Sequence, residues 1–108
     1  MSNPNTNPIT AAVIGKYCII RGRGFGVFAG TVKEVDDTRV LVENARRLWY
    51  WDGAASISQI AMEGVTAPRN CKFSMTVDSI VLRDYIEIIP TTAAAQKIIE
   101  EVNVWKRQ

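Results

Sequence analysis

The chain contains no histidine among its 108 residues. Histidine is the commonest general base and neutral metal ligand, so its absence excludes Ser-His-Asp triads and histidine-ligated metals. The carboxylates show no calcium-loop spacing, and two cysteines far apart in the sequence do not supply a zinc site. The sequence therefore predicts a protein that is not an enzyme and that carries no metal or other cofactor.

The sequence also has no long apolar run and no large excess of charge. A helix that crosses a bilayer needs roughly 20 apolar residues, and the stretch "MSNPNTNPIT" lacks the basic and apolar regions of a signal peptide. We therefore expect a cytoplasmic protein without a membrane partner, in which Cys18 and Cys71 are reduced and buried. The net charge of +2 does not favour a long polyanion, although a small phosphate-bearing molecule needs only a few arginines.

What the chain does contain is typical of one folded domain. Hydrophobic residues make up 47% of it and charged residues 22%, a balance found in globular proteins with a modest core. The first residues are rich in asparagine and proline and have no periodicity. We predict a flexible tail at residues 1–12 and a single ligand-binding domain at residues 13–108.

Short runs of β-branched or alternating apolar residues predict the strands. They lie at residues 16–22, 25–35, 38–44, 45–51, 71–77, 79–84 and 85–90. Asp36 and Asp37 predict a tight hairpin turn between the second and third runs. The run at residues 71–77 has the clearest alternation, which predicts that Phe73, Met75 and Val77 face the core.

Two segments have helical patterns. Ser56 with Gln59 forms a capping box and Gly64 stands where a helix ends, so residues 56–64 are predicted to form a short helix. We expect Met62, which lies in this helix, to fill a gap in the core.

The second helix is predicted at residues 91–105, where Thr91 or Thr92 is the amino-terminal cap. Its buried stripe would consist of Ile98, Val102 and Trp105. Together the elements predict an α+β domain with a small antiparallel β-sheet or Greek-key barrel, one inserted short helix and a C-terminal helix.

The stretch "RGRGFGVFAG", residues 21–30, contains four glycines. It lacks the strand and helix context of a dinucleotide-binding loop and the final Lys-Ser/Thr of a P-loop. Two compatible interpretations remain. The glycines allow a bulge, a sharp turn or close packing, or the N–H groups of the turn approach a phosphate that Arg21 and Arg23 flank.

The stretch "RRLWYW", residues 46–51, combines two arginines with three large aromatic residues. Strand alternation gives it two faces, with Arg46, Leu48 and Tyr50 on one and Arg47, Trp49 and Trp51 on the other. Both faces carry apolar bulk, so the pattern does not indicate which side is buried. Either the rings are core residues, or they line a pocket in which arginines bind phosphate oxygens and a ring stacks on a base.

The stretch "RNCKF", residues 69–73, lies at the junction of a loop and a predicted strand. Here Asn70 has the groups to bind the edge of an adenine and Phe73 the ring to stack on it.

Three segments carry a resemblance to a known family of small phage-encoded proteins. They are "VFAGTV", continued by "VLVENARRLWYWDGAASISQIAMEGV"; "CKFSMTVDSIVLRDYIEIIPTT"; and the ending "VNVWK". Over roughly residues 17–106 the chain resembles the first-described type of the Thoeris anti-defence sponge family. No catalytic motif takes part in the resemblance.

The resemblance implies a phage protein, located in the cytoplasm of the infected host, that sequesters cyclic ADP-ribose isomers made by bacterial TIR proteins. It also implies pockets formed with a second protomer, in a homodimer or larger assembly, and capture of cyclic oligonucleotides at separate sites. The candidate ligand-binding residues follow from chemistry, with arginines for phosphates, aromatic rings for adenine and an asparagine for polar edges. They are Arg21, Arg23, Phe25, Arg46, Arg47, Trp49, Trp51, Asn70, Phe73 and Arg83.

Three other functions are alternatives. A single-stranded nucleic-acid-binding module would use the same arginines and rings in an open groove, although the near-neutral charge disfavours it. A phage structural or assembly protein would bury the aromatic residues and bind no small molecule. A hydrolase would use Asp52, Asp78 or Asp84 as its carboxylate.

Overall fold

The computed structural model describes residues 8–107. Residues 1–7 of the predicted tail lie outside the described part, and Pro8–Ala11 form a single helical turn, α1. The other elements are β1 (Tyr17–Gly22), β2 (Gly26–Val35), β3 (Arg39–Tyr50), α2 (Ile57–Glu63), the 3-10 helix η2 (Pro68–Asn70), β4 (Lys72–Phe73), β5 (Val77–Arg83), β6 (Tyr85–Pro90) and α3 (Ala93–Glu101).

The strands form one antiparallel sheet in the order β4-β3-β2-β1-β6, and β5 also pairs with β3. The long strand β3 therefore holds β2 along one edge. Along its other edge lie first β5, from Arg39 to Ala45, and then β4, from Leu48 to Tyr50. The predicted α+β fold with an antiparallel sheet, an inserted short helix and a C-terminal helix is confirmed.

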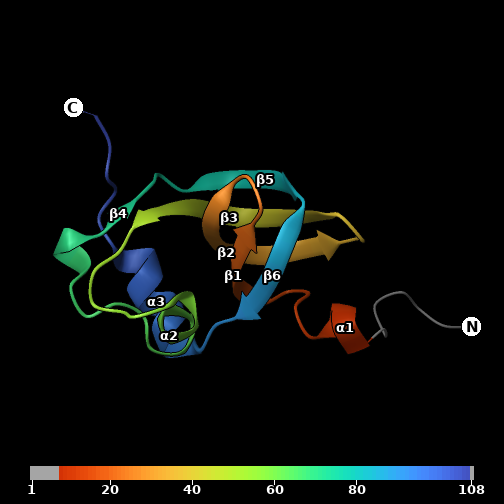
Figure 1. The fold of residues 1–108 in the computed structure, drawn as a ribbon, viewed down its shortest axis with the longest axis horizontal. Helices are drawn as coiled ribbons and strands as arrows, with labels where there is room; N and C mark the ends of the chain where they lie inside the picture. The colour runs from red at the N-terminus through yellow and green to blue at the C-terminus, as the bar shows by residue number, and fades with distance from the viewer. Residues whose placement is uncertain (1–7, 108) are drawn as a thin grey trace, which may run out of the picture.

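The sheet is strongly curled. β5 and β6 lie at opposite edges of it although only Asp84 separates them in the sequence. The two edges therefore meet at Asp84, and β1 and β6 cross over β2 and β3 at a steep angle (Figure 1). Asp84, with φ of 60°, joins the two hairpin turns: its N–H donates to the Thr38 carbonyl at 2.7 Å, and its carbonyl accepts from the Arg23 N–H at 3.2 Å.

Two hydrophobic cores lie on opposite faces of the sheet. The helix-side core packs α2 and α3 against the strands and consists of Tyr17, Ile19, Ala29, Leu48, Ile60, Ala61, Val65, Cys71, Phe73, Ile99 and Val102. The inner core is enclosed by the curled sheet and consists of Val13, Cys18, Ile20, Phe28, Val32, Val40, Val42, Ala45 and Leu82. Successive residues of β1 belong to alternate cores, because side chains along a strand point to alternate faces.

A β-bulge in β3 changes the faces of its second half. Asn44 has a positive φ of 51°, and the β2–β3 register shifts between Ala29 and Thr31. The extra residue lets Val42 and Ala45, three positions apart, enter the same inner core. Gly30 lies against this bulge, since a Cβ there would come within 2.5 Å of the Val42 side chain.

The helix α2 has the predicted caps. The Ser56 hydroxyl accepts from the Gln59 N–H at 3.2 Å, and Gly64 ends the helix with φ of 78°. The Gln59 side chain accepts from the Ala55 N–H instead of completing the box at Ser56. Met62 is half exposed, so its predicted core position is wrong.

Two predictions near the C-terminal half are wrong. The strand predicted at residues 71–77 is interrupted after Phe73, and Met75 and Val77 are exposed, because the chain there moves from β4 to β5 along the edge of β3. The predicted helix at residues 91–105 begins at its cap Thr92 but ends at Glu101, and Trp105 is exposed. No helix within residues 8–107 has the length and apolar character to cross a membrane.

Candidate functional site

A shallow hollow forms where β3 extends past the beginning of β2. Its volume is about 230 Å³, and it is lined by Phe25, Gly26, Val27, Arg47, Leu48, Trp49 and Trp51. We call it the Arg47 hollow. It brings together four side chains that the sequence predicted as ligand-binding, namely Phe25, Arg47, Trp49 and Trp51.

Arg47 is held between two rings. Its guanidinium carbon lies 4.4 Å from the centre of the Phe28 ring and 4.8 Å from that of the Trp49 ring, and its Nη1 donates to the Phe25 carbonyl at 2.6 Å. The guanidinium has five N–H groups, and the others meet no acceptor within residues 8–107. Arg47 is therefore fixed in position while most of its donors stay free for an anion.

The aromatic rings around Arg47 differ in their exposure to solvent. Trp49 is 60% exposed, whereas Trp51 is half-buried against the helix-side core. Phe25 packs edge-on against Phe28, with ring centres 5.8 Å apart. Trp49 is thus the ring with most surface available for stacking.

Arg46 faces the opposite side of β3 and is 3% exposed. Its guanidinium donates to the carbonyls of Phe73, Ser74, Ile99, Glu100 and Val102. Burial lowers the pKa of Arg46 from its usual value, but an arginine with these acceptors stays charged at neutral pH. Arg46 caps the C-terminal end of α3, and each of its guanidinium nitrogens is bonded to a backbone carbonyl in the interior, so we remove it from the candidate site.

Phe73 and Asn70 also lie outside the Arg47 hollow. Phe73 is fully buried in the helix-side core, where it cannot stack on a base, so we remove it as well. Asn70 is exposed on η2, and its Nδ2 donates to an oxygen of Asp52 at 2.9 Å. The structure therefore does not combine the two as an adenine pocket.

The remaining predicted arginines are dispersed over the surface. Arg21 pairs with Glu87 at 2.7 Å in an exposed ion pair between β1 and β6. Arg23 lies in the turn between β1 and β2, and Arg83 stands opposite Arg39 in the β3–β5 ladder. None of these three lines the Arg47 hollow.

The glycine-rich stretch forms the β1–β2 hairpin turn. Gly22 pairs with Gly26, and Gly26 has a φ of 84°, which favours glycine. Together with the close packing at Gly30, this matches the structural interpretation of the stretch. Approach of a phosphate to the turn stays a prediction.

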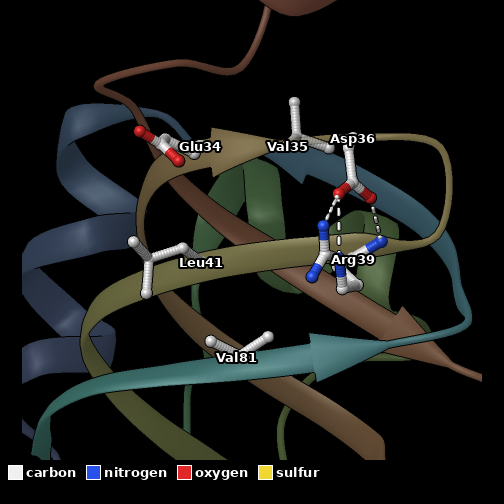
Figure 2. Close-up of a pocket in the computed structure, with 6 residues that line it drawn as sticks. All are labelled: Glu34, Val35, Asp36, Arg39, Leu41 and Val81. Atoms are coloured by element: carbon white, nitrogen blue, oxygen red, sulfur yellow. Dashed lines mark hydrogen bonds and ion pairs between the residues drawn. The ribbon is translucent and has the colours of Figure 1, made fainter.

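A second hollow, of about 220 Å³, lies at the turn between β2 and β3 and is lined by Glu34, Val35, Asp36, Arg39, Leu41 and Val81 (Figure 2). Arg39 donates to Asp36 from Nε at 2.9 Å and from Nη2 at 2.6 Å. These bonds, with two from backbone N–H groups, lower the pKa of Asp36 to about 2. The only arginine of this hollow is thus already paired, and it contains none of the predicted ligand-binding residues.

Sequence reasoning missed three residues that the structure brings together at the surface, Tyr50, Lys72 and Trp105. The Lys72 ammonium lies 5.3 Å from the centre of the Trp105 ring and 6.0 Å from that of Tyr50. The sequence offered no signal for this cluster, because Trp105 fits the helical spacing of Ile98 and Val102.

The described residues contain no group of three or more cysteines, aspartates and glutamates placed to hold a metal ion. Cys18 and Cys71 are buried and are not bonded to each other, and burial raises the pKa of the Cys18 thiol to about 11.

Comparison with known proteins gives one family. No curated protein and no solved structure matches the chain. One family model matches residues 15–99, a range that includes the Arg47 hollow and ends before Trp105. The chain therefore belongs to the family described as "Domain of unknown function (DUF6948)".

Proposed function

We propose that this protein is a phage anti-defence protein that binds and sequesters, without cleaving it, a cyclic ADP-ribose signal made by bacterial TIR proteins. It would act in the cytoplasm of the infected host. The sequence resemblance supplies the identity of the ligand. The observation that carries the proposal is Arg47, fixed between two rings at an open hollow with most of its donors free.

The chemistry of the Arg47 hollow suits a diphosphate joined to a base. A guanidinium donates two parallel hydrogen bonds to phosphate oxygens, and the stack on Phe28 and Trp49 holds Arg47 in place before binding. The exposed ring of Trp49 offers a face for adenine, and base stacking contributes about 1–3 kcal/mol. Sequestration needs tight binding and no general base.

The size of the hollow favours a site shared between two protomers. It measures about 230 Å³, below the roughly 300–1,000 Å³ of most small-molecule sites. A second copy placed over the Arg47 hollow would enclose the ligand, as expected of a homodimer or larger homo-oligomer.

The test of this proposal is recovery of the ligand. The purified protein is incubated with cyclic ADP-ribose and its glycocyclic isomers, washed and heated, and the released material is analysed by mass spectrometry. We expect an intact mass. A cleaved product would contradict sequestration and favour a hydrolase, and an empty protein would favour an assembly protein without a small-molecule ligand.

Two variants test the location of the site. Arg47→Ala is expected to weaken binding by about tenfold to a hundredfold, because it removes charge-assisted hydrogen bonds worth about 1.5–3 kcal/mol. Arg83→Ala is the matched control, since Arg83 is an exposed arginine outside the hollow. Calorimetric titration measures both. Loss of binding in Arg83→Ala but not in Arg47→Ala would place the ligand elsewhere.

A further inference from the structure

The C-terminal segment returns to the sheet after α3 ends. Val104 forms a parallel bridge with Phe73, and the Trp105 N–H donates to the Phe73 carbonyl at 2.9 Å. This places Trp105 beside Lys72, which precedes Phe73 in β4 and pairs with Tyr50 of β3. We call these side chains, with the following Lys106 and Arg107, the Trp105 surface.

The rings of the Trp105 surface are open to solvent. Tyr50 and Trp105 are each 52% exposed, and the Lys72 ammonium lies within cation–π distance of both rings. A large exposed apolar ring loses the stabilisation that burial would give it, so two of them around one cation indicate a surface that another molecule covers.

The cations of this surface are not neutralised by the protein. The ion pairs within residues 8–107 are Arg21 with Glu87 and Arg39 with Asp36. Lys72, Lys106 and Arg107 take part in neither and are exposed. The surface therefore combines unpaired positive charge with flat rings.

We propose that the Trp105 surface binds single-stranded nucleic acid. Bases stack on Tyr50 and Trp105, and Lys72, Lys106 and Arg107 contact phosphates. Every base has a π-face, so stacking on exposed rings accepts any sequence, and cations beside the rings follow the phosphate backbone. The complementarity of unpaired positive charge with phosphate, at rings that offer flat faces, favours this partner over an acidic peptide.

This inference goes beyond the proposed function, because Tyr50, Lys72 and Trp105 do not line the Arg47 hollow. The net charge of +2 disfavours an extended contact with a long polyanion, whereas a contact with two or three nucleotides needs only local cations. Three phosphate contacts predict that the logarithm of affinity falls with the logarithm of salt concentration with a slope of about −2.

The experiment is fluorescence anisotropy of labelled oligothymidine and oligouridine with the full chain at several salt concentrations. We expect binding that weakens with salt. Trp105→Ala and Lys72→Ala should each weaken it by about tenfold, whereas Trp105→Tyr, which keeps a ring, should retain most of it. Binding of both oligomers supports a general single-strand surface, and binding of one of them supports the proposal for that nucleic acid.

Arg47→Ala separates this proposal from the previous one. It should leave oligonucleotide binding unchanged while it weakens cyclic ADP-ribose binding. Trp105→Ala should weaken oligonucleotide binding and leave cyclic ADP-ribose binding unchanged. The proposal is overturned if neither oligomer binds at low salt, or if binding survives in a folded Trp105→Ala variant. Equally strong competition by polyglutamate would overturn it in favour of an acidic protein partner.

Discussion

Arg46 and Arg47 are neighbours in the sequence, and they lie in two different environments. Arg46 is enclosed by the helix-side core and donates hydrogen bonds to backbone carbonyls at the end of α3 and in the β4 region. Arg47 lies at the rim of the inner core, stacked on rings, with most donors free. The same residue type therefore stabilises the fold in one position and is available for binding in the next.

The β-bulge at Asn44 decides which arginine takes which role. If β3 continued through Asn44 in strict alternation, with no bulge, Arg46 would follow Val40 and Val42 onto the inner face and Arg47 would face the helices. The bulge shifts this alternation by one position, so Ala45 and not residue 44 follows Val42 into the inner core. The bulge at Asn44 thus determines which of the two arginines is structural and which is available for binding.

The largest effect is expected from inserting one alanine between Ala45 and Arg46. With the bulge in place, the insertion would exchange the two faces of residues 46–51, bring Arg47 toward α3 and turn Leu48 away from the helix-side core. We expect no stable fold, measured as loss of chemical-shift dispersion in an NMR spectrum. Deletion of Asn44 is the control, because it removes the extra residue, leaves Ala45 and Arg47 on the face of Val42 by regular alternation, and should stay folded. A well-folded insertion variant would show that the bulge does not set the faces.

The next effect is that of Arg46→Ala, which takes their side-chain donor from the carbonyls of Ser74 and Val102 and removes one of two donors to the carbonyls of Phe73 and Ile99. We expect the free energy of unfolding in urea to fall by about 3–5 kcal/mol. Arg46→Lys, which supplies fewer donors, should lie between this variant and the wild type.

Arg47→Ala is the matched control for stability. Loss of its cation–π contacts should lower the free energy of unfolding by only about 1 kcal/mol. Equal losses in Arg46→Ala and Arg47→Ala would remove the contrast between the two arginines.

The smallest effect is a pH dependence of the free energy of unfolding that is caused by Cys18, a buried thiol of the inner core. Burial raises the pKa of Cys18 from 9.0 to about 11, so the folded state holds this proton more tightly than the unfolded state does. The resulting stability is fully present below pH 9 and is lost as the pH rises toward 11. Between pH 9 and 10 we expect a loss of about 1 kcal/mol, measured by urea unfolding.

Cys18→Ala is the control for this pH dependence. The pKa values of Tyr17 and Tyr85 are also raised, chiefly by burial, but their contributions are lost mainly above pH 10. The slope between pH 9 and 10 should therefore be much smaller in Cys18→Ala. A slope that persists would assign the pH dependence to another group.

Local sequence signals predicted the regular parts of the fold. The strand ranges of β1 and β2, the acidic turn at Asp36 and the caps of α2 follow from β-branched runs, turn chemistry and capping preferences. Each of these signals depends on residues close together in the sequence, and that is why they could be found without the structure.

The candidate site was only partly predictable. Residues 46–51 were selected as a cluster of arginines and rings, and the structure places Arg47, Trp49 and Trp51 at one hollow. The face of each residue depended on a bulge that alternation does not reveal. Trp105 and Met75 were assigned to the core because their spacing is the same whether a face is buried or exposed. The contact of Trp105 with Lys72 joins distant parts of the chain, so no local pattern indicated it.

Strand β1 contributes side chains to both cores, and this affects how the protein unfolds. Tyr17 and Ile19 pack on one side while Cys18 and Ile20 pack on the other, so the strand cannot leave one core without leaving both. The helix-side core and the inner core should therefore unfold as one cooperative unit, and the amide hydrogens of β1 should be among the slowest to exchange with solvent. A destabilising substitution in either core then lowers the one free energy of unfolding that both cores share. Natural selection for stability therefore acts on the residues of both faces together.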